Sequence, residues 1–271
     1  MRLDDYLERV GVGPLTPPID ADALRRLHAA HREAFLFENV TIQTGGAISV
    51  DVEGIERKFL DQGSGGYCFE HNTLFGAVLR DLGLPVTTLL GRVRRGPPER
   101  WCRTHMVLRV DLDGQPWLAD VGFGAMGLFE PIPFAEGSSP AQIGVAYTLR
   151  REGSLWVLSA SLVGDDASAE PQDLYEFSDD PQTPGDVEVA NHYTATHPDS
   201  MFRRTLTIQR TSRRERTMLR QQVLTRYRNG RAEEEPVDRA QLGAVVREVF
   251  GIELPAGGFV FQTYPAKSGS G

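Results

Sequence analysis

Apolar residues recur at a spacing of three to four along much of the first third of the chain. This pattern predicts helices over residues 23–35 and 52–60, and a third helix that begins at Phe69. Aspartates that commonly cap helix N-termini precede the first of these segments. Gly83 follows the third segment, at the position where a glycine usually ends a helix. The first part of the chain is therefore predicted to be helical.

From residue 86 the pattern changes to short runs rich in β-branched and aromatic residues, separated by Gly, Pro and Asp. The predicted strands are residues 86–93, 104–112, 116–123, 146–151 and 154–162. Such a series is typical of an antiparallel sheet or barrel. Residues 164–185 are acidic and contain proline, so we expect a connection there.

The last part of the chain mixes both kinds of pattern. It predicts a short helix at 186–196, strands at 202–210 and 216–228, and a helix at 238–250. Helices followed by strands and then by mixed elements indicate an α+β fold with two or three subdomains.

Composition narrows the class of protein. The 271 residues are 40% hydrophobic and carry a formal net charge of −8, which is a poor match to the cationic surface of a nucleic-acid-binding protein. No run approaches 18 apolar residues, and the first residues lack the apolar segment of a secretory signal. We therefore expect a cytoplasmic protein that binds neither membranes nor nucleic acids. The sequence leaves open whether it forms a homo-oligomer.

The segment GSGGYCFEHN, residues 63–72, places Cys68 directly after glycines and at the start of a predicted helix. The positive end of the helix dipole would lower the pKa of the thiol and favour the nucleophilic thiolate. The glycines would leave room for a substrate carbonyl. Backbone N–H groups could then stabilise the oxyanion that develops on its oxygen. A small buried hydrophobe is the alternative interpretation of this cysteine.

Residues 104–124 predict a hairpin that turns at Asp113 and Gly114, a pair that favours a type I′ turn. With a two-residue turn and no bulge, the register places Asp120 opposite Val107. The side chain two residues before Val107 then becomes the diagonal neighbour of Asp120, about 7–8 Å away at Cα.

That diagonal neighbour is His105, close enough for a hydrogen bond to Asp120. The carboxylate would orient the imidazole and fix its tautomer, and the imidazole would take the proton of the Cys68 thiol. A structural His–Asp pair is the alternative, and spacing alone does not place Cys68 against His105.

Several motifs resemble those of the arylamine N-acetyltransferases. GGYCFEHN around Cys68, RTHMVLRV around His105 and DVGFG from Asp120 resemble the three catalytic blocks of that family. FENV at 37–40 and NHYTATHPDSMF at 191–202 resemble two further signatures, in the family's order. The N-terminal LDDYLERVG also fits.

The resemblance implies an α+β fold of three parts. These are an N-terminal helical bundle over residues 1–84, a central antiparallel β-barrel over 85–188 and a C-terminal α/β lid over 189–271. The Cys-His-Asp site would be akin to that of papain-like proteases.

The resemblance also implies the chemistry, a ping-pong acetyl transfer from acetyl-CoA through an acetyl-cysteine to an arylamine or hydrazine, with no metal and a role in xenobiotic metabolism. By position, the residues that would bind the acceptor are Phe37, Tyr67, Val93 and Phe202. Those near the path of the CoA chain are Thr104, Gly124 and Gly127.

The chain departs from the family pattern before the nucleophile. Family members usually carry arginine where this chain has Ser64, and often a second arginine at the position of Gly63. The family arginine is thought to pair with the glutamate that matches Glu38. Glu38 therefore needs another donor here, because a buried carboxylate without a partner is costly.

Three other features are interpreted conservatively. Cys102 is expected to be an incidental thiol, and His71 a packing or surface residue. The arginines between residues 203 and 228 fit solvated strand faces, with a cationic rim for the CoA phosphates as the alternative.

Three alternative functions stay open at this point. The first is a macrolactam-forming amide synthase of the same fold, which takes its acyl chain from a carrier protein. The second is a hydrolase related to cysteine proteases or transglutaminases. The third is a binding scaffold without catalytic activity.

Overall fold

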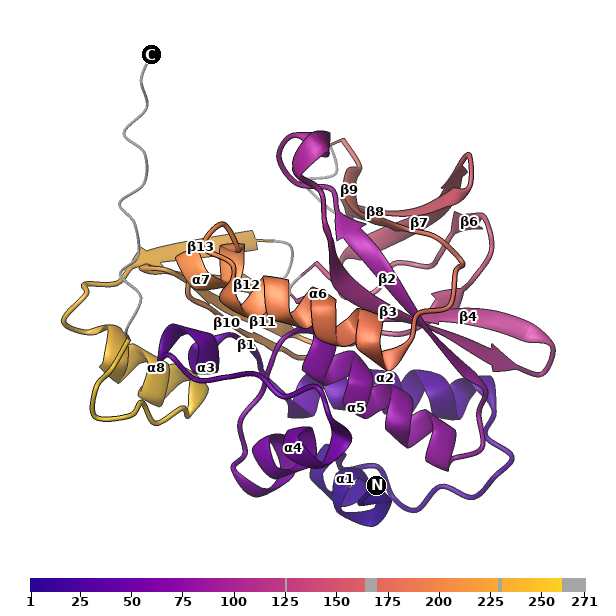
Figure 1. The fold of residues 1–271 in the computed structure, drawn as a ribbon, viewed down its shortest axis with the longest axis horizontal. Helices are drawn as coiled ribbons and strands as arrows, with labels where there is room; N and C mark the ends of the chain where they lie inside the picture. The colour runs from indigo at the N-terminus through magenta and orange to yellow at the C-terminus, as the bar shows by residue number, and fades with distance from the viewer. Residues whose placement is uncertain (125, 164–169, 229–230, 260–271) are drawn as a thin grey trace.

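The computed structural model describes residues 1–124, 126–163, 170–228 and 231–259. Helices and two antiparallel sheets make up an α+β fold (Figure 1). The helices are α1 (Leu3–Val10), α2 (Ala21–Ala34), α3 (Val40–Gln43), α4 (Val52–Glu56), α5 (Cys68–Asp81), α6 (Pro184–Thr196), α7 (Met201–Arg204) and α8 (Leu242–Phe250). A π-helical turn, η1 (Arg57–Asp61), continues α4, and a 3-10 turn, η2 (Pro98–Arg100), precedes the third strand.

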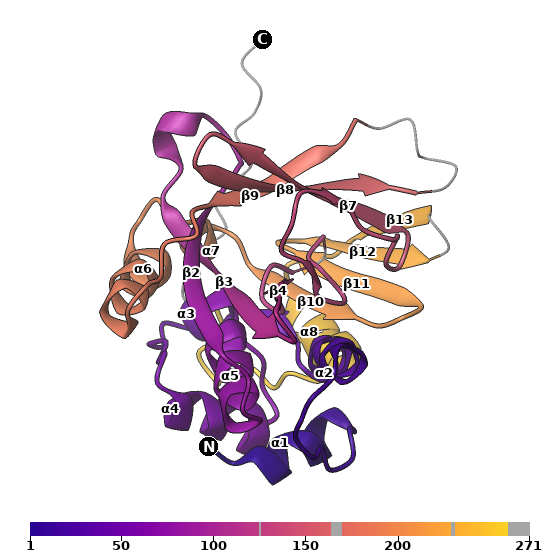
Figure 2. The same ribbon diagram turned by 90° about the vertical axis from the view of Figure 1, so that its right-hand side faces the viewer.

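The larger sheet has eight strands in the order β5-β4-β3-β2-β9-β8-β7-β6. Their bounds are β2 (Val86–Val93), β3 (Arg103–Leu112), β4 (Gln115–Ala119), β5 (Ile132–Pro133), β6 (Gly137–Ser138), β7 (Val145–Glu152), β8 (Leu155–Leu162) and β9 (Gln172–Phe177). The sheet is curled (Figure 2). Within the described ranges its end strands β5 and β6 do not pair with each other, so it is an open half-barrel rather than the closed barrel that we expected.

The smaller sheet has five strands in the order β1-β10-β11-β12-β13. They are β1 (Phe37–Glu38), β10 (Thr207–Thr211), β11 (Glu215–Arg220), β12 (Val223–Arg228) and β13 (Arg231–Pro236). Because β1 comes from the N-terminal part of the chain, the last sheet is joined directly to the segment that precedes the nucleophile loop. Figure 2 shows this sheet beside the curled sheet.

The predicted helices are confirmed with small shifts. Asp20 caps α2, since its side chain accepts a hydrogen bond from the backbone N–H of Ala23. Helix α5 begins at Cys68 itself, and Gly83 follows it with a φ of 83°. The segment predicted as one helix over residues 52–60 is α4 with its π-helical extension.

The predicted hairpin is also confirmed. Asp113 and Gly114 have φ angles of 53° and 75°, as a type I′ turn requires. The register runs from Leu112 opposite Gln115 to Leu108 opposite Ala119 without a bulge. Asp120 follows directly after β4, where the chain leaves the sheet, so the predicted strand over residues 116–123 ends early.

The prediction that residues 164–185 form only a connection is wrong. Strand β9 lies within that range and occupies a central position between β2 and β8. Its acidic residues are not solvated loop charges, because Asp173 and Glu176 form ion pairs with Arg94 at 2.8 and 2.9 Å. The sequence pattern missed this pairing because Arg94 is far away along the chain.

The last third of the chain differs from the prediction in detail. Helix α7 occupies the start of the strand expected at 202–210. The strand expected at 216–228 is a hairpin of two strands, which turns at Gln221 with a φ of 55°. Strand β13 was not predicted.

Three buried apolar clusters hold these elements together. The first lies between the N-terminal helices and one face of β3 and β4, the second inside the curled sheet, and the third between α8 and the five-stranded sheet. Helix α6 crosses the front of the molecule in Figure 1 and packs against β3. In the part of the chain that the structure describes, no helix is long and apolar enough to cross a membrane.

Candidate active site

Cys68 is the first residue of α5, and its side chain points toward the start of strand β3. The residue is only 3% exposed. Its Sγ donates a hydrogen bond to the backbone oxygen of Thr104 at 3.6 Å. The thiol therefore lies beside the residue that precedes His105.

The glycines before Cys68 allow a close crossing of two chain segments. A Cβ on Gly65 would lie 1.8 Å from the backbone oxygen of Leu36. The N–H of Gly66 donates to that same oxygen at 3.1 Å, and its own oxygen accepts from Glu38 N at 2.7 Å. The nucleophile loop is thereby held against the segment that begins β1.

His105 and Asp120 form the hydrogen bond that the hairpin register predicted. Nε2 of His105 lies 2.8 Å from Oδ2 of Asp120, and both side chains are buried. Because an ionised carboxylate only accepts hydrogen bonds, Nε2 carries the proton and donates. The other ring nitrogen, Nδ1, is then the basic nitrogen of the imidazole.

Asp120 accepts two further hydrogen bonds at its other carboxylate oxygen. Nδ2 of Asn72 and the backbone N–H of Gly122 donate to Oδ1 at 3.0 and 2.9 Å. Burial alone would raise the pKa of Asp120, but the charge and hydrogen bond of His105, with the bonds from Asn72 and Gly122, lower it to about 2. The carboxylate is therefore ionised at neutral pH although it is fully buried.

The Cys68 thiol differs from the expectation that its pKa would be low. Burial raises the pKa of Cys68 well above its ordinary value, and the charge of Asp120 raises it further. Backbone hydrogen bonds from Met106 on β3 and from Phe69 at the helix start lower it by less. The helix end thus does not suffice to form a thiolate, and a proton acceptor beside the sulfur is needed.

Three of the four residues expected to bind the acceptor form one aromatic cluster. The ring of Phe202 lies 6.1 Å from that of Phe37 and 5.1 Å from that of Tyr67, between centroids. The Tyr67 hydroxyl donates to the side-chain oxygen of Asn191 on α6. Segments from the first and the last parts of the chain therefore meet next to Cys68.

Val93, the fourth expected acceptor residue, lies on the other side of His105. It is the last residue of β2 and pairs with Tyr175 on β9. The Tyr175 ring contacts the imidazole of His105 with centroids 4.7 Å apart, and the Phe123 ring contacts it at 5.0 Å. Two aromatic rings thus shield the imidazole from solvent.

Gly124 and Gly127 lie in the loop after Asp120. Gly124 has a φ of 93°, and its oxygen accepts hydrogen bonds from the N–H of Gly127 at 2.9 Å and from Arg32 at 2.6 Å. Arg32 is a buried residue of α2 and also donates to the oxygen of Val121 at 3.3 Å. A buried guanidinium therefore fixes the loop that we expect near the CoA chain.

Cys102, His71 and the arginines between residues 203 and 228 were given no catalytic role from the sequence, and the structure places them as follows. Cys102 is exposed. His71 is buried and accepts from His31 Nε2, so it packs inside the helical part. In the arginine-rich segment, Arg226 and Arg228 form ion pairs with Glu235 and Glu215 at 3.1 and 2.6 Å. Within the described ranges, no group of three or more His, Cys, Asp or Glu residues could hold a metal ion.

Comparison with known proteins places this geometry in a family. A family model described as N-acetyltransferase matches residues 20–259. An arylamine N-acetyltransferase of Mycolicibacterium smegmatis is 36% identical over 262 residues, which cover 94% of this chain and 93% of the relative. That of Escherichia coli (strain K12) is 36% identical over 238 residues, which cover 86% and 83%.

The chain belongs to the arylamine N-acetyltransferase family. As a member of that family it is an acyltransferase. Solved structures of the family agree with the fold. The Salmonella typhimurium arylamine N-acetyltransferase superposes with a TM-score of 0.84 at 35% identity, over 92% of this chain and 90% of that chain. The Mycobacterium marinum arylamine N-acetyltransferase in complex with CoA gives a TM-score of 0.85 at 34% identity, over 92% of each chain.

In this arylamine N-acetyltransferase, several residues around the site escaped the sequence analysis. Asn72 follows Cys68 by one helical turn, and that spacing is a signal that could have found it. His28 accepts a hydrogen bond from the backbone N–H of Asp120 at 3.1 Å, across 92 residues of chain. Lys58 lies 3.6 Å from Glu38, the carboxylate that lacks the usual arginine partner. For His28 and Lys58 no local sequence pattern indicates the contact.

Proposed function

We propose that this chain transfers an acetyl group from acetyl-CoA to an arylamine or hydrazine, by a ping-pong mechanism through an acetyl-Cys68 intermediate. The observation that carries the proposal is the position of the Cys68 thiol at the start of α5, beside the hydrogen-bonded pair of His105 and Asp120. The crystallised Mycobacterium marinum relative in complex with CoA supports the donor.

In the first half-reaction the imidazole of His105 takes the thiol proton. Because the buried thiol has a raised pKa, the sulfur becomes a nucleophile only as this proton moves to Nδ1. The sulfur of Cys68 then bonds to the acetyl carbon, the thioester bond to CoA breaks, and the imidazolium protonates the departing CoA thiolate. Asp120, ionised and hydrogen-bonded to Nε2, stabilises the imidazolium.

In the second half-reaction the amine nitrogen attacks the acetyl carbon of acetyl-Cys68. His105 takes a proton from the attacking nitrogen and returns it to the sulfur as the carbon–sulfur bond breaks. The amide leaves, and the free thiol is restored. Both halves use the same base, which is consistent with a single His–Asp pair serving both substrates.

The proposal assigns the remaining predicted residues by their surroundings. The acceptor-binding residues are Phe37, Tyr67, Val93 and Phe202, and those near the CoA chain are Thr104, Gly124 and Gly127. We also propose the division into a helical bundle (1–84), a sheet domain (85–188) and a lid (189–271). The aromatic cluster next to Cys68 supports the assignment of Phe37, Tyr67 and Phe202 to the acceptor, because their rings lie together beside the thiol.

Two measurements test the proposal. Incubation with acetyl-CoA, followed by intact-protein mass spectrometry, should show one added acetyl group on wild type and on Cys102→Ala, but none on Cys68→Ala. A CoA-release assay with a panel of arylamines and hydrazides should show turnover that Cys68→Ala lacks. Equal CoA release by wild type and Cys68→Ala would overturn the mechanism. Acylation by a carrier-protein thioester but not by acetyl-CoA would replace it with the amide synthase alternative.

A further inference from the structure

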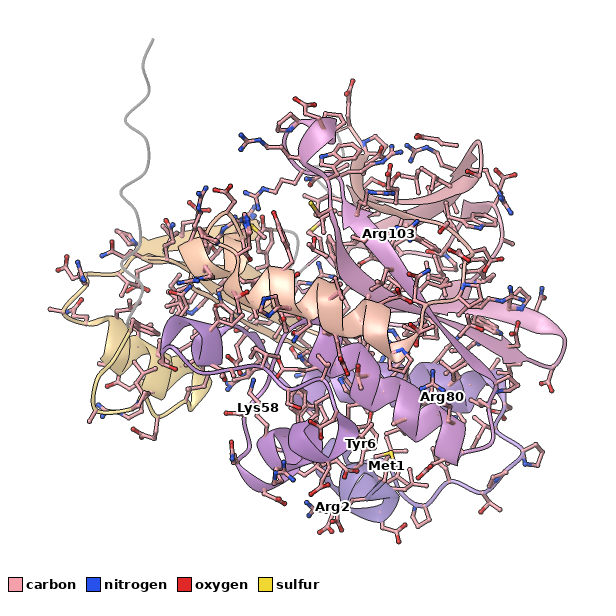
Figure 3. All side chains as sticks on the ribbon, viewed as in Figure 1. Met1, Arg2, Tyr6, Lys58, Arg80 and Arg103 are labelled. Carbon is pink, nitrogen blue, oxygen red and sulfur yellow. The ribbon has the colours of Figure 1, made fainter. Side chains whose placement is uncertain are left out.

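A lysine that is mostly shielded from solvent lies against the nucleophile loop. Lys58 is one of two lysines in the sequence, and the other, Lys267, lies outside the described residues. It belongs to the π-helical turn η1, and Figure 3 labels it just above α4. Its side chain is 15% exposed. Burial of an ammonium group requires strong compensation by negative charge.

Two carboxylates provide that compensation. Nζ of Lys58 donates to Oε1 of Glu70 at 2.7 Å and lies 3.6 Å from Oε1 of Glu38. The carboxylate side chains are 1% and 2% exposed. Among the residues that the structure describes, no other cation forms an ion pair with either of them. The ammonium group of Lys58 thus compensates the charge of two buried carboxylates.

Each carboxylate holds a different segment of backbone. Glu70, in the first turn of α5, accepts from the backbone N–H of Tyr67 at 3.1 Å, directly before Cys68. Glu38 accepts from the backbone N–H of Val40. The backbone N–H of Glu38 also donates to the nucleophile loop through Gly66. Lys58 therefore joins the loop that carries the thiol to the segment that carries Phe37.

We propose that Lys58 is a positioning residue for acetyl transfer, whose ammonium fixes Cys68 relative to the acceptor pocket by holding Glu70 and Glu38 together. This inference rests on the proposed function of Cys68 as the nucleophile. Lys58 does not touch the reacting atoms, and it acts through the two carboxylates and the backbone that they hold. A displacement of about 1 Å at the thiol would lower the rate about 100-fold.

The charges make the effect of Lys58 dependent on pH. Burial raises the pKa of Glu70 to about 7, and Glu38 adds to the increase while Lys58 opposes it. Burial lowers the pKa of the neighbouring His71 to about 3 and raises that of Tyr67 well above its ordinary value, so both stay uncharged. Without Lys58, two carboxylates would repel each other increasingly as the pH rises through neutrality.

The test compares three variants in a Cys102→Ala background, in which Cys68 is the only thiol. Lys58→Met removes the charge, and Lys58→Arg keeps it. Arg57→Met is the matched control, because Arg57 precedes Lys58 in the same turn and, among the described residues, forms an ion pair only with the exposed Glu53, at 2.6 Å. The rate of Cys68 alkylation by iodoacetamide is measured from about pH 6 to about pH 9, together with kcat/KM for acetyl transfer.

We expect Lys58→Met to lower both rates about 10- to 100-fold, with a loss that grows as the pH rises. Lys58→Arg should restore the pH profile, and Arg57→Met should match wild type. Wild-type rates in Lys58→Met, or a loss equal at all pH values that Lys58→Arg does not restore, would overturn the proposal. Alkylation requires no acetyl donor. The alkylation rates therefore still test the role of Lys58 if the protein does not transfer acetyl groups.

A second measurement covers the case in which Lys58→Met does not fold. In wild-type protein labelled with 15N-lysine, the two ammonium groups are compared by NMR. We expect the Nζ protons of Lys58 to exchange with water much more slowly than those of free lysine in the same buffer, because they are largely shielded and held by Glu70. If neither lysine of the protein exchanges more slowly than free lysine, the contact between Lys58 and Glu70 does not exist in solution.

Discussion

The side chain of Asn72 joins the helix of the nucleophile to the carboxylate of Asp120. Its Nδ2 donates to Oδ1 of Asp120 at 3.0 Å and to the backbone oxygen of Met106 at 2.7 Å. Its Oδ1 accepts from the backbone N–H of Val121 at 3.1 Å. Because Asn72 lies one turn after Cys68 on α5, these bonds fix the distance between the sulfur and the His–Asp pair.

Asn72→Leu should therefore lower both stability and activity. The change keeps the side-chain volume but leaves the backbone oxygen of Met106 and the backbone N–H of Val121 without the partner that Asn72 provides. Each buried group without a partner costs about 1–3 kcal/mol of unfolding free energy. Urea unfolding should show a loss of at least about 2 kcal/mol, and kcat should fall. Thr73→Val is the control, since within the described ranges that hydroxyl donates only to the sulfur of Met106, at 3.8 Å. An unchanged Asn72→Leu enzyme would contradict the role given to these bonds.

Asp120→Asn should lower kcat by about 10²- to 10⁴-fold, because an amide facing Nε2 favours the tautomer in which Nδ1 carries the proton and cannot act as a base. It should also remove one source of acid sensitivity. The fold lowers the pKa of Asp120 from its ordinary value of 3.8 to about 2, so its contribution to stability is present above pH 3.8 and is lost as the pH falls through 2.

Steady-state kinetics and acid unfolding measure both effects of this change. Asp113→Asn is a suitable control, because asparagine tolerates the φ of 53° at that turn. Full activity of Asp120→Asn would mean that the carboxylate does not set the tautomer.

Gly122→Ala should displace the nucleophile. A Cβ there would lie 2.7 Å from the Cα of Cys68 and 2.7 Å from Nδ2 of Asn72, which is closer than side-chain atoms can approach. We expect a loss of about 1–3 kcal/mol in unfolding free energy and a marked fall in acetyl transfer. Gly13→Ala is the control, since nothing lies within 4 Å of its added Cβ. If both variants behave alike, the close packing of Gly122 on Cys68 is not required.

His28 should make the protein less stable in mild acid. It accepts from Asp120 N and donates to the oxygen of Phe129, so it is buried and neutral. Burial lowers the pKa of His28 from 6.5 to about 4. Above pH 6.5 neither state binds the proton. Below pH 6.5 the unfolded chain binds it and the folded chain does not, so stability falls until about pH 4.

The difference between wild type and His28→Gln isolates this effect. Between pH 7 and pH 5, wild type should lose about 2 kcal/mol more unfolding free energy than the variant. The comparison is needed because Glu70, with a pKa raised to about 7, changes the stability in the opposite direction. Its contribution to the unfolding free energy is lost as the pH rises. His192→Gln, at an exposed position, is the control for the loss of a histidine side chain and should have the unfolding free energy of wild type at neutral pH. Parallel curves for wild type and His28→Gln would refute the prediction.

Local patterns were sufficient for several parts of the site. Apolar periodicity and flanking glycines placed the start of α5 at Phe69, one residue after its observed start at Cys68, because helix ends depend on residues only a few positions away. The pairing of His105 with Asp120 followed from a two-residue turn, because a tight hairpin fixes the register of both strands. Strand β9 was missed because its charges are compensated by Arg94, which the sequence places far away.

The sequence by itself determined helices α2, α5, α6 and α8 and the β3–β4 hairpin, since each depends on contacts within about twenty residues of chain. It pointed to Cys68, His105 and Asp120 through motifs that resemble those of the family. Only the tertiary structure decided what surrounds them. It places Lys58 between two carboxylates, Asn72 and His28 around Asp120, and the Cys68 thiol in an environment that raises its pKa. Those properties depend on burial and on charges brought together from distant segments, and no local pattern records either.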